Sequence, residues 1–229
     1  MLAQTHLKQQ LDALRHSNVS GFVRLRVAAN VDLFPGWLAA QTLYPRIYWQ
    51  ARGPRSPEYV ALGAIHELTR PADIQRVCDL ANSNSEDSPR YYGGLAFDPA
   101  QPGWQGFGPC RFVLPRIELV RRGECVSLCL NLWLTDGNLD AELQAAEAAL
   151  DALQPEAPLP PLQKRPWQRQ DVPGQAQWQT LVERVTAPAF QAHTPKVVLS
   201  RESVLTGQHG DAPLCPWSLL TQWASHAQE

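Results

Sequence analysis

The sequence predicts an α+β fold, in which an antiparallel sheet packs against helices. The first observation is the strict alternation of apolar and polar side chains over residues 124–134, which is typical of an antiparallel strand with one buried face. The second is a pair of hairpin patterns, each with a turn between two strand-like runs. The third is the 20 prolines among 229 residues, which favour short elements and fixed loops.

The first part of the chain is expected to hold two helices and several short strands. Residues 2–16 place their leucines roughly on one helical face, and Pro71 is expected to begin a second helix. The apolar positions of that second helix are Ile74, Val77, Cys78 and Ala81. A Gly/Pro-rich turn separates two of the expected strands and predicts the first hairpin. The expected strands are 22–27, 47–50, 59–65 and 92–98.

The second hairpin is expected to join an arm at 112–120 to an arm at 124–134 through the turn Arg122-Gly123. An Ala-rich helix should follow at 140–153, with its apolar residues on one stripe. A further helix should begin after Gly174 and end or kink at Pro188. The last expected elements are a strand over 196–206 and a helix over 216–224. Six prolines between 154 and 173 mark a linker, so we divide the chain into 1–153, 154–173 and 174–229.

Composition excludes several classes of function. The net charge is −2, which gives no electrostatic footprint for nucleic acid or an anionic membrane. No apolar run approaches the roughly 18 residues of a membrane span, and the N-terminus has no apolar signal core. Five scattered cysteines without a zinc spacing indicate reduced thiols. We therefore expect a cytoplasmic protein without nucleic-acid or membrane partners.

Lys196 is the residue that most clearly indicates catalysis. It is the first residue of the run Lys-Val-Val-Leu-Ser-Arg, at the start of the expected strand over 196–206 and after a long helical stretch. On composition alone, a lysine in that position is usually a solvated surface residue, because lysine is almost never fully buried without a partner. Gly93-Gly94 is too short for a phosphate loop. The six histidines are dispersed and form no catalytic pattern.

The segment 195–201 resembles the catalytic-lysine strand of the isochorismate synthases, a group within the chorismate-utilising enzymes. Three earlier segments resemble other strands of the same family, in the same order and at matching spacing. These segments are 44–50, 93–98 and 112–118. The resemblance implies an incomplete chorismate-binding fold, like that of anthranilate synthase component I, with 174–229 as the truncated start of the chorismate-binding region. It is closest to the isochorismate synthases of menaquinone biosynthesis.

The resemblance implies that chorismate is converted to isochorismate by Mg²⁺-dependent addition of water at C2, with loss of the C4 hydroxyl. Lys196 then corresponds to the general base that activates the water. The general acid, the Mg²⁺ ligands and the carboxylate-binding groups are expected in a missing C-terminal half, so this chain should contribute no metal ligand. Residues 197–229 hold only Glu202, Asp211 and Glu229 as acids, without a pairing suited to a hard metal.

Three readings of the whole chain stay open at this point. The first is a truncated isochorismate synthase of a menaquinone or siderophore pathway that is poorly active alone, with a complementing C-terminal fragment as its partner. The second is a non-enzymatic remnant or binding module derived from that family. The third keeps the family but changes the product to one like that of a salicylate synthase.

Overall fold

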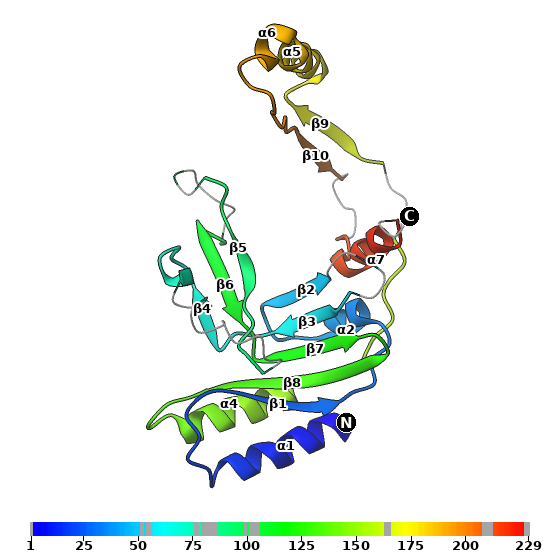
Figure 1. The fold of residues 1–229 in the computed structure, drawn as a ribbon. Coiled ribbons are helices and arrows are strands. Elements are labelled where there is room, and N and C mark those ends of the chain that lie inside the picture. Colours follow the sequence, from blue (N-terminus) through cyan, green and yellow to red (C-terminus); the bar gives the residue numbers. More distant parts are fainter. Residues whose placement is uncertain are drawn as a thin grey trace. The chain divides into compact units, whose positions relative to one another are not determined.

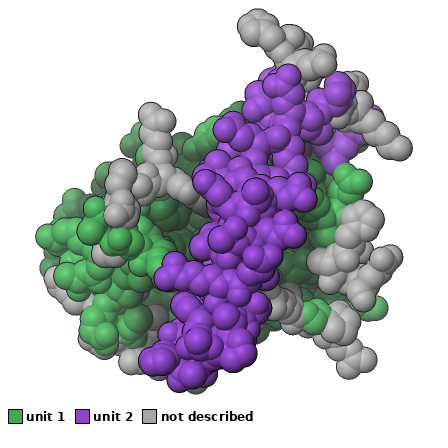
Figure 2. Space-filling view, turned by 90° about the horizontal axis from the view of Figure 1, so that it is seen from above, with its two compact units in different colours: residues 1–160, 216–229 green, residues 161–215 purple. Residues whose placement is uncertain are grey.

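The structure is a computed structural model of residues 1–229. It describes the chain except at residues 1, 51–52, 54–55, 76–77, 79–86, 99, 101–105, 163–165, 208–212 and 227–229. The described residues fall into two compact units, which Figure 2 shows in green and purple. Unit 1 comprises residues 1–160 together with 216–229, and unit 2 comprises residues 161–215.

Unit 1 is built on a five-stranded antiparallel sheet with the strand order β1-β8-β7-β3-β2 (Figure 1). Its strands are β1 (Gly21–Ala28), β2 (Arg46–Gln50), β3 (Glu58–Leu62), β7 (Ile117–Arg122) and β8 (Cys125–Leu134). The alternation predicted for residues 124–134 is confirmed, because β8 directs its leucines to one face, where they are buried. In this register Val23 of β1 lies opposite Leu132, and Leu119 of β7 lies opposite Leu128.

Two helices cover the leucine face of this sheet (Figure 1). They are α1 (Leu2–Leu14), which packs on β1, and α4 (Leu139–Asp151), which packs on β8. Leu7 of α1, Leu150 of α4, and Leu130 and Leu132 of β8 are all fully buried in one core cluster. Each such leucine contributes about 1.5–3 kcal/mol when it leaves water. Both helices were expected from their apolar stripes.

A smaller sheet of unit 1 has the strand order β4-β6-β5. Its strands are β4 (His66–Leu68), β5 (Tyr92–Leu95) and β6 (Cys110–Leu114). The single arm predicted over 112–120 is wrong, because β6 ends at Leu114 in this sheet and β7 begins at Ile117 in the other. Pro115 has no N–H to continue a ladder, and its carbonyl instead accepts a hydrogen bond from Asn131 at 2.9 Å.

The helix expected from Pro71 is helical over 73–75, whereas Val77 and Ala81 lie outside the described residues. Helix α2 (Phe34–Ala40) was not expected, and it buries Phe34, Trp37 and Leu38 in the core of unit 1. The C-terminal helix α7 (Pro216–His226) was expected and contacts α2. Among the described helices, none has the length and apolar content that a membrane crossing requires.

Unit 2 is a two-stranded ribbon with two helices. The ribbon pairs β9 (Gln168–Val172) with β10 (Glu202–Thr206), and the helices between them are α5 (Gln175–Thr186) and α6 (Pro188–Gln191). The helix after Gly174 and its end before Pro188 are therefore confirmed. Strand β9 lies inside the range predicted as a linker. The division into 1–153, 154–173 and 174–229 stays a prediction, and the structure's own units meet at 160/161 and 215/216.

Candidate functional site

Lys196 lies in an irregular, exposed segment of unit 2, between α6 and β10. The strand predicted over 196–206 is present at Glu202–Thr206, but its predicted start at Lys196 is wrong, because regular pairing begins only at Glu202. The register explains this late start. Glu202 lies opposite Val172, and the next residue of the partner strand is Pro173, which has no N–H for a ladder bond. Gly174 then serves as the N-cap of α5, so β9 offers nothing that residues before Glu202 could pair with.

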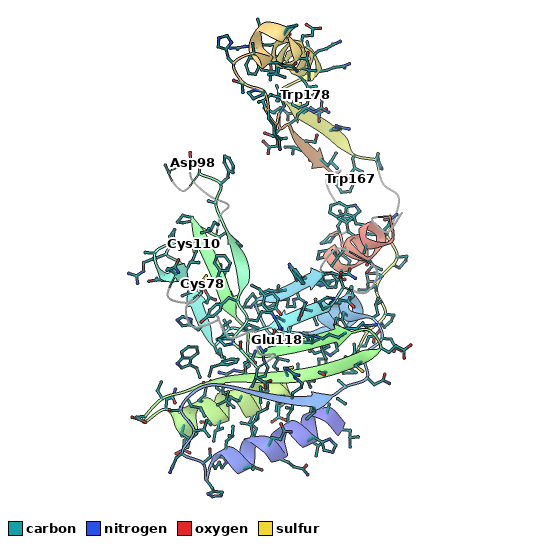
Figure 3. The ribbon with its side chains drawn as sticks, in the orientation of Figure 1. Cys78, Asp98, Cys110, Glu118, Trp167 and Trp178 are labelled. Carbon is teal, nitrogen blue, oxygen red and sulfur yellow. The ribbon has the colours of Figure 1, made fainter. Side chains whose placement is uncertain are left out.

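A polar cluster joins the ribbon of unit 2 to helix α5. The Asp171 carboxylate accepts hydrogen bonds from Ser203 at 2.5 Å and Arg169 at 2.9 Å, and Arg201 lies 3.6 Å away. The hydroxyl of Ser203 and then the Arg169 guanidinium lower the pKa of Asp171. The guanidinium of Arg201 lies 5.5 Å from the ring centroid of Trp178, which Figure 3 labels. This cluster lines a hollow of about 470 Å³, and Lys196 is not among its lining residues.

The described residues do not fit a Mg²⁺ site. No group of three or more His, Cys, Asp or Glu side chains converges anywhere in the described part of the chain. Of the three acids after Lys196, Glu202 is exposed at the start of β10, whereas Asp211 and Glu229 lie outside the described residues. A hard cation requires several oxygen ligands at once. The described residues therefore offer no site at which a bound metal could take part in a reaction.

A second group of chemically capable residues lies in unit 1, on the face of the large sheet opposite the leucines. Alternation along β7 places Glu118 on this face, between the core residues Ile117 and Leu119. Figure 3 labels Glu118, whose side chain is fully buried. Such a carboxylate is tolerated only when its oxygens are paired and hydrogen-bonded.

Four side chains from four strands or loops donate to the Glu118 carboxylate. Arg24 of β1 donates at 2.5 Å, and Tyr92 of β5 donates its hydroxyl at 2.7 Å. Asn131 of β8 donates at 2.9 Å, and Arg90 donates at 3.3 Å. We call these five residues the Glu118 cluster. It joins the two sheets of unit 1, because Tyr92 belongs to the smaller sheet and the other three strands belong to the larger one.

The Glu118 cluster holds two guanidinium groups against one carboxylate. The side chain of Arg24 is 1% exposed and also donates to the Asn131 side-chain oxygen at 2.9 Å. The side chain of Arg90 is 27% exposed, so it is the charged member of the cluster that reaches solvent. Burial, together with the adjacent Glu118 carboxylate, raises the pKa of Tyr92 well above its usual range. Tyr92 therefore stays a hydrogen-bond donor at any physiological pH.

Beside this cluster, a cleft of about 710 Å³ opens between β2–β3 of the large sheet and β5–β6 of the smaller one. Three aromatic rings follow one another along its wall. The ring centroids of Trp49 and Tyr59 are 5.5 Å apart, and those of Tyr59 and Tyr92 are 6.4 Å apart. The guanidinium of Arg90 lies 4.3 Å from the Tyr59 centroid. The other lining residues are Pro45, Arg46, Ile47, Tyr48, Tyr91, Gly93, Phe107, Arg111, Phe112 and Val113.

Sequence reasoning singled out Lys196 and missed the Glu118 cluster. A signal for part of it was present, since Glu118 and Arg24 each occupy the interior of a strand with apolar residues on both sides. Charges in that position are rarely buried unless they are paired. The sequence gives no sign of which segments pair them, because Arg24 and Glu118 are 94 residues apart.

Comparisons with known proteins support the family resemblance that was inferred from four segments of the sequence. The family model described as "Chorismate binding enzyme" matches residues 12–229. Isochorismate synthase MenF of Escherichia coli strain K12 is 32% identical over 169 residues, which make up 74% of this chain and 36% of the relative. The solved structure of MenF, the menaquinone-specific isochorismate synthase from E. coli, superposes with a TM-score of 0.62 at 28% identity.

That superposition covers 81% of this chain and 41% of the MenF chain, so the present chain spans less than half the length of the relative it matches. The family resemblance predicted from residues 44–50, 93–98, 112–118 and 195–201 is confirmed, as is the combination of helices with an antiparallel sheet. The chain belongs to the chorismate binding enzyme family.

Proposed function

We propose that this chain is part of an isochorismate synthase that acts in menaquinone biosynthesis. The observation that carries the proposal is the 32% identity to MenF over 74% of the chain, together with the superposition on the MenF structure. The substrate would be chorismate and the product isochorismate. The reaction adds water at C2 of the ring, shifts the ring double bonds and expels the C4 hydroxyl.

In this proposal Lys196 is the general base. Its neutral amine takes a proton from water while the water oxygen bonds to C2, and the departing C4 hydroxyl receives a proton from an acid outside the described residues. A lysine accepts a proton only in its neutral form, which burial favours. Because Lys196 is exposed in unit 2, a covering surface must supply that burial.

A second polypeptide, complementing this chain, would provide that surface. Every residue of β10 is exposed, and an isolated two-stranded ribbon is marginally stable in water. Both strands of the ribbon present an unpaired edge within the described part of unit 2, to which further strands can add. We propose that this partner also holds Mg²⁺, which would polarise chorismate when bound, and the groups that bind the substrate carboxylates.

The test is an assay of this chain with chorismate and Mg²⁺, alone and mixed with a polypeptide that comprises the part of E. coli MenF beyond the matched region. Isochorismate is quantified by chromatography. We expect little turnover from the chain alone and clear turnover from the mixture. Lys196→Ala should abolish that turnover. Lys8→Ala is the matched control, because Lys8 lies on α1 and pairs with Asp151 in unit 1.

Other outcomes distinguish the remaining readings. Full Mg²⁺-dependent turnover by the chain alone would contradict the need for a partner. Salicylate in place of isochorismate would change the product but keep the family. No turnover in any mixture, with the chain well folded, would favour a binding module that has no enzymatic role.

A further inference from the structure

We infer that the hollow between the β9–β10 ribbon and helix α5 of unit 2 is a binding site for a small organic molecule that carries one carboxylate. Its volume of about 470 Å³ lies within the range of roughly 300–1,000 Å³ that small-molecule pockets occupy. The site is independent of the proposed reaction, because Lys196 is not among its described lining residues. Those residues are Arg169, Asp171, Gln175, Trp178, Gln179 and Arg201.

Arg201 offers the hydrogen-bond donors of this site. Its side chain is 26% exposed, and its guanidinium lies 3.6 Å from the Asp171 carboxylate, which is longer than a hydrogen bond. Among the described residues, no protein atom accepts a hydrogen bond from Arg201. None of its nitrogens is among the fully buried side-chain atoms that lack a partner, so its N–H groups reach solvent. A ligand carboxylate can accept two of these donors side by side.

The charge of the lining favours a ligand with a single negative charge. The described lining holds two arginines and one aspartate, which gives a formal net charge of +1. Asp171 stays ionised at pH 7, because the Ser203 hydroxyl and the Arg169 guanidinium lower its pKa. Glu202 precedes Ser203 in β10, so alternation places it on the opposite face of the ribbon. One carboxylate therefore balances the lining, whereas Asp171 would repel the second charge of a dianion.

The uncharged lining residues indicate the rest of the ligand. Gln175 and Gln179 are four residues apart on α5, so their side chains are neighbours on one face of the helix. Each amide can both donate and accept a hydrogen bond, as a hydroxyl group requires. The indole of Trp178, which also lines the hollow, offers apolar surface to carbon atoms. A carboxylate on a hydroxylated carbon ring therefore matches the lining.

The test titrates this chain with quinate, a hydroxylated cyclohexane ring with one carboxylate, and follows the Trp178 indole N–H by NMR. Trp178→Phe assigns that resonance, and we expect a saturable shift. Methyl quinate, the uncharged ester, should bind at least about tenfold more weakly, because it loses a charge-assisted contact. Arg201→Gln should weaken quinate to a similar extent. Arg184→Gln is the matched control, because it removes the same charge from the last turn of α5 and should leave the affinity unchanged.

Inorganic phosphate at pH 8, where it is mostly a dianion, is the second probe. It should bind the parent chain more weakly than quinate and gain affinity in Asp171→Asn, which removes the repelling charge. Tighter binding of phosphate than of quinate by the parent chain, or no gain in Asp171→Asn, would overturn the assignment to a single carboxylate.

Three other outcomes would overturn the site itself. They are equal affinities for quinate and its ester, unchanged affinity in Arg201→Gln, and the absence of a saturable shift. The comparison of acid with ester uses the parent chain, so it holds even where a variant fails to fold, which the amide spectrum of each variant would show. All of these measurements report binding alone, so they are separate from isochorismate formation.

Discussion

Glu118 is a fully buried carboxylate that depends on hydrogen bonds from several parts of unit 1. Its carboxylate accepts hydrogen bonds from Arg24, Arg90, Tyr92 and Asn131 while fully buried. The hydrogen bonds that join the two sheets of unit 1 at this point therefore converge on one side chain. Removal of the Glu118 charge would leave the buried Arg24 guanidinium and the partly exposed Arg90 guanidinium without this carboxylate, which is costly.

We predict that Glu118→Leu lowers the free energy of unfolding by about 3–5 kcal/mol, since two guanidinium groups would lose the Glu118 carboxylate, one of them buried. Urea denaturation followed by circular dichroism measures the change. Glu124→Leu is the matched control, because Glu124 is exposed in the β7–β8 turn and its replacement should change stability by less than about 0.5 kcal/mol. Similar losses in both variants would contradict a special role for the buried cluster.

Glu142 supplies a second prediction at this scale. Burial opposes its ionisation, but two hydrogen bonds from Arg116, at 2.8 and 3.0 Å, and one from the Trp133 N–H lower the pKa of Glu142 overall. A carboxyl whose folded-state pKa is lowered stabilises the protein above its unfolded pKa of 4.5, and that contribution is lost as pH falls through the folded value.

Stability measured from pH 7 down through pH 4 and below should therefore fall more steeply in the parent chain than in Glu142→Gln. The variant should be the less stable of the two at pH 7, and the difference should shrink in acid. Urea denaturation at each pH gives both curves. Parallel curves would show that the Arg116–Glu142 pair contributes nothing to the acid sensitivity.

At the scale of elements, the pairing of β5 with β6 depends on a glycine. A Cβ atom at Gly93 would lie 1.9 Å from the Arg111 carbonyl oxygen and 2.7 Å from the Phe112 Cα, so backbone would have to move. Among the described residues, the nearest atom that a Cβ at the neighbouring Gly94 would meet is in the ring of Phe107, at 3.9 Å. These two adjacent positions in one strand therefore differ sharply in the space that they offer.

We expect Gly93→Ala to lower the free energy of unfolding by about 1–3 kcal/mol, because overpacking forces backbone shifts. Gly94→Ala should be close to neutral and serves as the control. Hydrogen exchange of the β6 amides would show the effect locally, with protection lost in Gly93→Ala alone. Equal protection in the two variants would argue against the close approach of these strands.

The elements also show how far the sequence can predict this fold. Strand β8 and helices α1 and α4 carry strong periodicity, because each has one face in the core, and all three were predicted. The break at Pro115 was missed, since apolar residues continue on both sides of it and only the partner strands differ. Strand β9 was missed, and the strand predicted over 196–206 was placed to begin six residues before β10, for the opposite reason. The residues of this ribbon are mostly exposed, so no buried face imposes alternation.

The candidate sites differ in the same way, because some of their features leave a signal in the sequence and others depend on long-range contacts. Lys196 was identified by resemblance, and its role as a base stays a prediction. The Glu118 cluster and the aromatic cleft draw on segments near residues 24, 49, 59, 90, 118 and 131, which only the folded sheets bring together. Pairwise contacts over such separations leave no periodic pattern in a single sequence.

At the scale of the whole chain, unit 2 is inserted into the sequence of unit 1. The chain leaves unit 1 at Pro160 and returns at Pro216, and the Ser218 hydroxyl donates to the Pro160 carbonyl at 2.7 Å. The two points of unit 1 between which unit 2 is inserted are therefore close together. The main core cluster, from Leu7 to Leu153 with Trp217 packed against it, belongs entirely to unit 1.

We therefore predict that replacement of residues 161–215 by a short Gly/Ser linker leaves unit 1 folded, because loop closure over such a short span costs little and no residue of the core cluster is removed. Amide protection in β7 and β8 should match that of the intact chain within experimental error. A second variant that ends at Pro160 also lacks α7 and its contacts with α2, so it should be less stable. Loss of cooperative unfolding in the linker variant would show that the core of unit 1 requires unit 2. Equal stability of the two variants would show that the return of α7 contributes nothing to unit 1.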